Sequence, residues 1–324
     1  MIAMLRRFGG MAGVAAIIVA FWLLLPDTFM TAQNWLNISQ QISVLLVVAA
    51  VMTVVMAMGD FDLSVGAMAS LAGVVAGALF VAGWPVPLAL AGALLAGLLG
   101  GLLNGALVSL IGILPFVATL ATLTVFSGLA FVVSDGRTIF GRDIPAGFGA
   151  FALGGLPLGT SAQGRPLLLP NLTLIAALVT ATTWLLLERT VFGRHLYAIG
   201  SNREAARLAG VRVDALRIAA FGLTGLGAAG AGLMVASRVA SANPTQGDGV
   251  MLNAIAAVFL GMALTERGQA RMPATLAGVV VLGVLDNGLT QLRVDSYVRE
   301  VLVGLIILIA VAASALGHRV KPRG

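Results

Sequence analysis

The sequence predicts an all-α, polytopic integral membrane protein with about ten transmembrane helices. Of its 324 residues, 59% are hydrophobic and only 10% are charged, and the mean hydropathy is +1.03. A soluble domain carries about 25% charged residues, so this chain has too few charges to solvate a surface in water. Apolar stretches of roughly 20 residues recur along it, which is the length that an α-helix needs to cross a bilayer.

The apolar stretches follow one another without a linker or a shift in composition. We therefore expect residues 1–324 to form a single transmembrane domain. The eighth stretch is too short for an ordinary crossing, so we expect a broken or partial one there. The long loop 134–170 is rich in Gly and Pro and contains an apolar piece, Phe148 to Leu153, that could form a helix on the outer surface. The ten stretches span roughly 11–30, 38–58, 66–83, 86–110, 115–133, 171–189, 211–237, 251–264, 272–291 and 297–316.

The basic residues set the expected orientation. If the N-terminus is cytoplasmic, 13 of the 19 basic residues lie inside and six lie outside; the reverse orientation inverts this split. Loops on the cytoplasmic side carry the excess of Lys and Arg, so we expect both termini in the cytoplasm. The six outer residues would be Arg137, Arg142, Arg165, Arg238, Arg293 and Arg299.

Glycine spacing predicts close helix packing. Gly97, Gly101 and Gly105 lie four residues apart on one helix face, and small residues at this spacing let two helices approach closely. That face could pack inside one subunit or between two subunits. Gly225 and Gly227, with a third glycine at 230, match a dinucleotide-binding pattern, but they lie inside an apolar span rather than after a strand, so we interpret them as a packing face.

Several classes of function are excluded by composition. The chain has no cysteine, and its two histidines, His195 and His318, have no partner at metal-ligand spacing, so no metal site is expected. Lys321 is its only lysine, so it cannot supply the lysine of a nucleotide-binding P-loop. No nucleophile or acid–base set indicates an enzyme, and neither a catalytic residue nor a cofactor is expected. The net charge of +6 reflects membrane topology rather than nucleic-acid binding.

A charged segment at 193–217 interrupts the apolar sequence on the cytoplasmic side. Ser201 and Glu204 have the spacing of a capping box, and Gly210 is well placed to end the same short helix. Its apolar face would consist of Ala205, Leu208 and Ala209, beside a basic stripe of Arg203 and Arg207. Such a helix either joins two spans or docks into a groove on a partner.

This segment also carries a resemblance. Glu204, Ala205 and Ala206, with Gly210 following, resemble the EAA motif in the coupling loop of ABC transporter permeases. The whole chain resembles the monosaccharide branch of the branched-chain amino acid and ribose permease family. Four further blocks carry that resemblance: GDFDLSVGAMASLAG at 59–73, GLLNGALVSLIGILPFVATLATLTVFSGLA at 101–130, SRVASANPTQGDG at 237–249 and GVLDNGLTQL at 283–292.

The resemblance implies the multi-pass permease subunit of an ATP-driven sugar importer in the bacterial cytoplasmic (inner) membrane. A second permease subunit would complete the pore, cytoplasmic ATP-binding subunits would hydrolyse ATP, and a periplasmic binding protein would deliver the monosaccharide. The coupling residues would be Ser201, Glu204, Ala205, Ala206, Arg207, Leu208 and Gly210. The chain departs from the family pattern at the TERGQAR turn, 265–271, and at Asn253, where the family usually has an acidic residue.

Polar residues inside the predicted spans are candidates for the translocation pathway, because such residues usually face a bundle interior or water. The candidates are Asp62, Ser64, Asn104, Asp286 and Asn287. Asn104 could equally form a hydrogen bond between helices, and Asp62 could be a structural cap at the inner mouth. We expect Asp286 to face the cavity, since an ionised Asp facing lipid is the costliest alternative.

The main alternative is a secondary transporter that uses an ion gradient to move a small polar solute. Such a protein needs acidic residues in mid-membrane and needs no docking helix. Asp286 is the only acidic residue predicted deep in a span, which gives this alternative little support.

Overall fold

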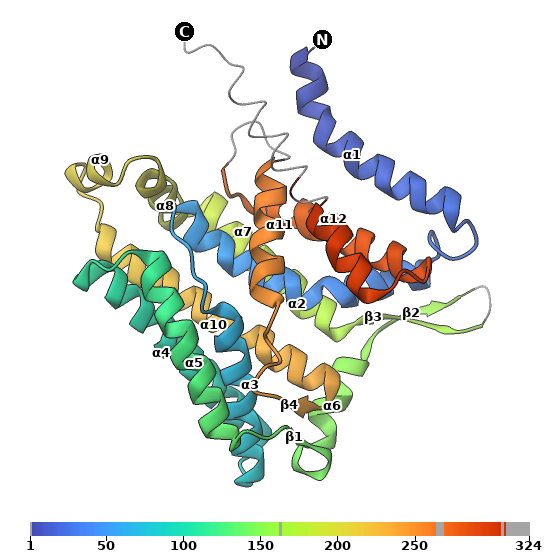
Figure 1. Ribbon diagram of the computed structural model, residues 1–324, viewed down its shortest axis with the longest axis horizontal. Coiled ribbons are helices and arrows are strands. Elements are labelled where there is room, and N and C mark those ends of the chain that lie inside the picture. The colour runs from blue at the N-terminus through green and yellow to red at the C-terminus, as the bar shows by residue number, and fades with distance from the viewer. Residues whose placement is uncertain (1, 162–163, 264–268, 306–307, 309–324) are drawn as a thin grey trace.

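The computed structural model describes residues 2–161, 164–263, 269–305 and 308 (Figure 1). It is built mainly of helices, which confirms the all-α class. Residues 296–305 are also helical. The helices are α1 (Ile2–Leu24), α2 (Ala32–Ala57), α3 (Val65–Val81), α4 (Val86–Ala106) with a π-helical turn at Leu107–Ile111, α5 (Pro115–Ser134), a 3₁₀ turn at Gly141–Asp143, α6 (Ala146–Leu153), α7 (Asn171–Arg189), α8 (Val191–Ser201), α9 (Arg203–Leu208), α10 (Val213–Val239), α11 (Val250–Ala263) and α12 (Met272–Gln291).

The first nine predicted stretches each correspond to a helix. Among the described residues, six helical segments are long and apolar enough to cross a membrane; α3, α11 and part of α1 are shorter apolar helices. The expected count of ten spans is therefore not established. The last stretch, 297–316, lies partly outside the described residues, as does most of the TERGQAR turn. The six long segments are Ala32–Ala57, Val86–Ile111, Pro115–Ser134, Asn171–Arg189, Val213–Val239 and Met272–Gln291.

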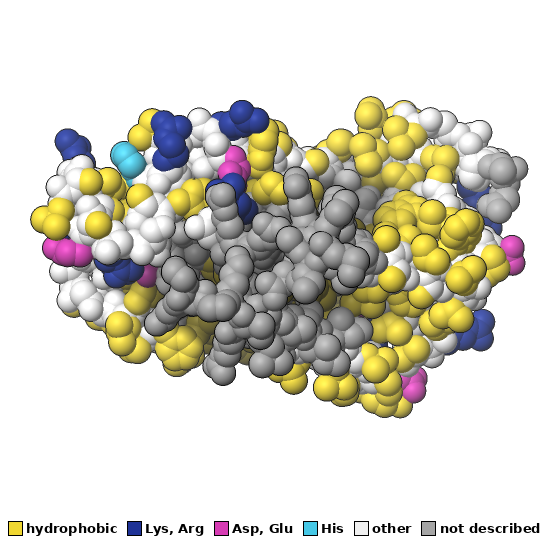
Figure 2. Space-filling model, turned by 90° about the horizontal axis from the view of Figure 1, so that it is seen from above, with side chains coloured by type: hydrophobic (Ala, Val, Ile, Leu, Met, Phe, Trp, Pro, Cys, Tyr) yellow, Lys and Arg dark blue, Asp and Glu magenta, His cyan; other side chains and the backbone are white. Residues whose placement is uncertain are grey.

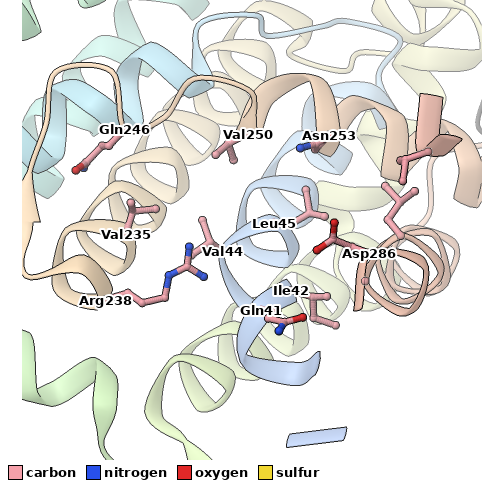
Figure 3. Close-up of a pocket in the computed structure, with 13 residues that line it drawn as sticks. Gln41, Ile42, Val44, Leu45, Val235, Arg238, Gln246, Val250, Asn253 and Asp286 are labelled. Atoms are coloured by element: carbon pink, nitrogen blue, oxygen red, sulfur yellow. The ribbon is translucent and has the colours of Figure 1, made fainter. Parts of the chain in front are cut away.

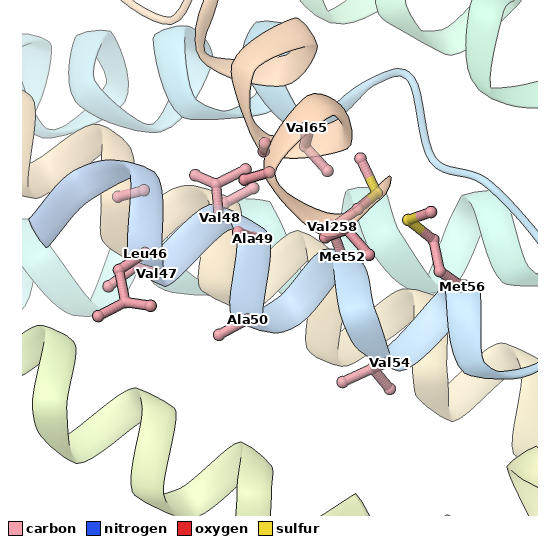
Figure 4. Close-up of a cluster of buried hydrophobic side chains, with 14 of the residues drawn as sticks. Leu46, Val47, Val48, Ala49, Ala50, Met52, Val54, Met56, Val65 and Val258 are labelled. Carbon is pink, nitrogen blue, oxygen red and sulfur yellow. The ribbon is translucent and has the colours of Figure 1, made fainter. Parts of the chain in front are cut away.

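Helix α2 runs through the middle of the molecule. From Val44 to Ala57 nearly every side chain is buried, and these side chains point in all directions from the helix axis (Figure 4). A helix that is apolar on every side belongs in the core of a bundle. Helices α7, α10, α11 and α12 pack around it.

Helices α2 and α10 run in opposite directions. The end of α2 packs against Gly200 of α8, whereas the end of α10 reaches α6, where the Ser237 hydroxyl donates to the Phe148 carbonyl at 2.6 Å. Figure 1 shows α8 and α9 at one end of the bundle, the α9 end, and α6 at the opposite end, the α6 end. Helices α3 and α4 pack on α10, while α11 and α12 pack on α2.

Helices α4 and α10 pack through the predicted glycine face. A Cβ added at Gly97 would lie 2.5 Å from the Gly225 carbonyl oxygen, and one at Gly105 would lie 2.6 Å from the Ile218 Cα. These contacts show that the face packs inside one chain. Gly225 belongs to the same contact, and Gly227 packs on Val51 of α2, so the dinucleotide-like pattern is a packing surface as interpreted.

The α6 end carries the few strands. β1 (Ile139–Phe140) pairs with β4 (Ser241–Ala242), and β2 (Gly155–Thr160) forms an antiparallel hairpin with β3 (Pro166–Pro170). No pattern in the sequence predicted these strands. Helix α6 covers Ala146–Leu153, where the apolar piece at 148–153 predicted a helix.

Candidate functional site

Helix α9 is a short helix whose first turn is capped by Asn202. The Asn202 side chain accepts a hydrogen bond from the Ala205 backbone N–H at 2.9 Å. The predicted capping box is wrong, because Ser201 is still the last residue of α8 and the cap falls one position later. Glu204 lies in the first turn, where its negative charge suits the helix N-terminus.

Gly210 ends α9 as predicted. Its φ of +84° lies in the left-handed region that favours glycine. The Gly210 N–H donates to the Arg207 carbonyl at 3.0 Å, and the Val211 N–H donates to the Ala206 carbonyl at 3.0 Å. These two bonds form a Schellman motif, so both ends of α9 are closed by local hydrogen bonds.

The side chains of α9 divide between the bundle and the surface. Ala206 is buried, whereas Ala205, Leu208 and Ala209 are exposed, with Leu208 82% exposed. In Figure 2 arginine and histidine side chains gather over the end of the molecule where α8 and α9 lie. An exposed leucine on a rigid helix among basic side chains is suited to docking into a groove on a partner protein.

A carboxylate that the sequence analysis did not single out, Asp60, fixes α9 to the bundle. Its Oδ1 accepts a hydrogen bond from Arg203 Nη2 at 2.9 Å, and its Oδ2 accepts one from Arg217 Nε at 2.8 Å. Arg203 is therefore bound to the bundle rather than free in a basic stripe. Arg207 forms a weaker, exposed ion pair with Asp214 at 3.4 Å.

A second polar cluster fixes α8 to α7 and to the start of α12. The Tyr197 hydroxyl donates to Glu188 Oε1 at 3.0 Å, and Arg271 Nη1 donates to Glu188 Oε2 at 3.3 Å. The Arg271 guanidinium also lies over the Tyr197 ring. Burial raises the pKa of the Tyr197 hydroxyl, and the Glu188 carboxylate raises it further, so Tyr197 remains a protonated donor at neutral pH.

A cavity of about 280 Å³ lies between α2, α10, α11 and α12, toward the α6 end. Arg238 reaches from α10 and Asp286 from α12 toward the face of α2 that carries Gln41 (Figure 3). Gln246 and Asn253 also line the cavity. The other walls are mainly apolar: Ile42, Val44, Leu45, Val235, Val250, Leu282, Gly283 and Val303.

The charged groups of this cavity remain accessible. The Asp286 carboxylate is half exposed and pairs with Arg299 Nε at 3.1 Å. The volume is near the lower end of the range for small-molecule pockets, about 300 Å³. The cavity thus offers hydrogen-bond donors and acceptors that can pair with the hydroxyl groups of a small polar solute.

Asp62, Ser64 and Asn104 form a separate, fully buried network. The Ser64 hydroxyl donates to Asp62 Oδ1 at 2.6 Å, and Asn104 Nδ2 donates to the Ser64 hydroxyl at 2.8 Å. The Thr122 hydroxyl donates to Asn104 Oδ1 at 2.7 Å. The network joins the α2–α3 connection to α4 and α5, and none of its members lines the cavity that contains Asp286.

Asn287 also lies between helices. It is buried and donates to Gln41 Oε1 at 3.4 Å. Gln291 Nε2 donates to Asn287 Oδ1 at 2.8 Å and to Asn34 Oδ1 at 2.9 Å. These amides join α12 to α2 beside the cavity, so Asn287 borders the cavity only through Gln41.

Within the described residues, no group of three or more His, Cys, Asp or Glu side chains could hold a metal ion.

Comparisons with known proteins agree with this architecture. The sequence model of a family described as "Branched-chain amino acid transport system / permease component" matches residues 34–311. The ribose import permease protein of Bacillus subtilis is 38% identical over 310 residues, covering 95% of this chain and 92% of the relative. The xylose transport system permease protein of Escherichia coli is 30% identical over 364 residues, covering 95% and 91%.

A solved structure has the same fold at low sequence similarity. It is an ABC transporter in an inward-facing conformation, with a TM-score of 0.52 and 15% sequence identity, and the match covers 93% of this chain and 96% of the other.

Proposed function

This chain belongs to the family of branched-chain amino acid transport system permease components, and from that premise we propose that it is the membrane-spanning subunit of an ATP-driven monosaccharide importer. Its relatives include permease proteins for ribose, D-allose and xylose. The observation that carries the proposal is α9, a short helix closed at both ends that presents an exposed leucine at one end of an apolar bundle.

In this proposal α9 docks into a groove on a cytoplasmic ATP-binding subunit, which hydrolyses ATP. Leu208 enters the groove, with Ala205 beside it, while Arg207 and Glu204 contact the rim. Ala206 faces the bundle, and Ser201 and Gly210 hold the flanking turns. These last three residues thus orient α9 without touching the partner.

The cavity between α2, α10, α11 and α12 is the proposed entry to the sugar pathway. A periplasmic binding protein delivers the sugar to this end, and a second permease subunit completes the pore. Arg238 and Asp286 would exchange hydrogen bonds with sugar hydroxyls. A path for a released solute must hold it weakly, and a few half-exposed groups meet that requirement.

The orientation that this requires places α9 and both termini in the cytoplasm. Because the chain has no cysteine, single cysteines report topology directly. We expect Ser201→Cys to react with a membrane-impermeant maleimide only from the cytoplasmic side, and Ser161→Cys only from outside. Labelling of Ser161→Cys from the cytoplasmic side alone would show that the orientation is the opposite of the proposed one.

The partner assignment is tested by co-purification and uptake. Proteoliposomes that contain this chain and its co-purified ATP-binding subunit should take up sugar only when ATP is present, and ionophores that abolish ion gradients should leave uptake unchanged. Leu208→Glu should reduce recovery of the ATP-binding subunit, whereas Leu158→Glu, at another exposed leucine in the β2–β3 hairpin, should not. Uptake that stops with the ionophore would favour the ion-gradient alternative.

A further inference from the structure

Asp60 joins α9 to α10 through its ion pairs with Arg203 and Arg217. Docking of α9 on a partner does not by itself require these contacts. Asp60 follows α2 directly, and a Schellman motif fixes its backbone: the Gly59 N–H donates to the Met56 carbonyl and the Asp60 N–H donates to the Val55 carbonyl, both at 3.1 Å. Gly59 has a φ of +81°, which permits this reversal. The Asp60 carboxylate is thus held at one position relative to α2.

The two arginines that bind Asp60 differ in their surroundings. Arg217 is 6% exposed and also donates to the Val108 carbonyl in the π-helical turn after α4, at 3.4 Å. Arg203 is 43% exposed. Separating Arg217 from Asp60 would leave two unpaired buried charges, which is costly. Separating Arg203 from Asp60 costs less, because Arg203 can turn to water and the Asp60 carboxylate stays paired with Arg217.

The elements joined at Asp60 continue to the cavity. Asp60 lies in the turn that ends α2, and α2 carries Gln41 on the cavity wall. Helix α10 carries Arg217 in its second turn and Arg238 on the cavity wall. Arg217 and Arg238 are separated by about 30 Å along a continuous helix, at 1.5 Å per residue. A rigid helix of that length converts a small tilt at one end into a displacement at the other.

We propose that Asp60 and Arg203 form the releasable contact through which α9 transmits movement of the ATP-binding subunit to α2 and α10. Arg217 keeps the Asp60 carboxylate paired and in place when Arg203 leaves. Arg203 is then a positioning residue for transport, distinct from the residues that dock. This inference rests on the proposed function, because it takes α9 to be the docking helix.

The test compares two arginines at the α9 end of the bundle. Arg203→Gln removes the charge that reaches Asp60, and Arg203→Lys restores it. Arg194→Gln is the matched control, because Arg194 is an exposed arginine of α8 that lies outside α9 and outside the contact with Asp60. Arg203 is partly exposed, so its variants should fold; recovery of the complex and its melting temperature are recorded for each. The readout is sugar transported per ATP hydrolysed in proteoliposomes.

We expect Arg203→Gln to lower this ratio by about fivefold or more, the lower range of a coupling free energy between two sites, with complex recovery unchanged. Arg203→Lys should recover most of the loss, and Arg194→Gln should match the wild type. An unchanged ratio for Arg203→Gln, or an equal loss for both glutamine variants, would overturn the proposal. A loss of complex recovery with Arg203→Gln would make Arg203 a docking residue, which overturns this inference but supports the proposed function. If the wild type recovers no ATP-binding subunit, the proposed function itself fails.

Discussion

The contact between α4 and α10 gives the sharpest prediction on stability. A Cβ at Gly101 would lie 3.0 Å from the Gly222 Cα and closer still to the Phe221 carbonyl oxygen. Both obstacles are backbone atoms of α10, so no side chain can rotate away. Gly101→Ala therefore forces the two helices apart along the whole face.

The size of the effect follows from this geometry. To reach an ordinary van der Waals distance, the two backbones must separate by about 1 Å, and overpacking of this kind typically costs about 1–3 kcal/mol. The separation also loosens the contacts at Gly97 and Gly105, which share the face. Using about 2–4 °C per kcal/mol for a large domain, we expect the melting temperature to fall by roughly 2–12 °C.

The measurement is thermal unfolding of the purified chain in detergent, followed by tryptophan fluorescence. The matched control is Gly128→Ala in α5, where an added Cβ meets nothing within 4 Å. That variant should melt at the wild-type temperature or slightly above it, because alanine favours helix more than glycine does. If Gly101→Ala has the same melting temperature as Gly128→Ala, α4 and α10 do not pack through this face.

Three further perturbations test the site. Asn202→Ala should increase hydrogen exchange in α9 by removing a cap typically worth about 1 kcal/mol, and Asn202→Asp, which can cap equally well, should not. Asn104→Ala removes the buried hydrogen bonds that Asn104 makes with the hydroxyls of Ser64 and Thr122, so it should destabilise the chain by about 1–3 kcal/mol in the same melting assay. Asp286→Leu should lower sugar uptake while recovery of the complex stays normal. Normal uptake would show that Asp286 is not part of the pathway, and reduced recovery would show that it is a structural residue.

Most helices could be predicted because lipid imposes a length and a composition that are visible in the sequence. Helix α7 and helix α12 match the predicted stretches 171–189 and 272–291. The short helices α3 and α11 show why the number of spans could not be predicted with the same success. They begin near each other inside the bundle, where a Cβ at Gly66 would lie 2.8 Å from the Gly247 carbonyl oxygen. An apolar stretch that ends inside the protein has the composition of a span without its length.

The error at the start of α9 has a local cause. Ser201 and Asn202 are both good N-cap residues, and the glutamate three positions after Ser201 favoured the serine. Packing of α8 against the end of α2 determines which residue is the N-cap, because it extends α8 through Ser201. The cap then falls on the next residue able to accept the bond.

The role of Asp60 depended on distance in space, which no local pattern encodes. Arg203 and Arg217 lie 143 and 157 positions away from it in the chain. One signal was available: Gly59 and Asp60 end a long apolar stretch in a chain with only 13 acidic residues. An acidic residue at a helix exit, in a protein of this composition, is a reasonable first candidate for a buried ion pair.

The polar residues of the spans separate into two kinds for a single physical reason. A polar group in a membrane protein needs either a protein partner or water. Asp62, Ser64 and Asn104 satisfy one another, so their network can be buried completely and serves to fix α4 and α5 to the α2–α3 connection. Arg238 lines the cavity, and Asp286 is half exposed despite its pair with Arg299. A solute that replaces water there needs only to offer hydroxyl groups, whereas entry into the buried network would require its hydrogen bonds to be broken. The proposed pathway therefore passes Asp286 and Arg238 and avoids Asn104.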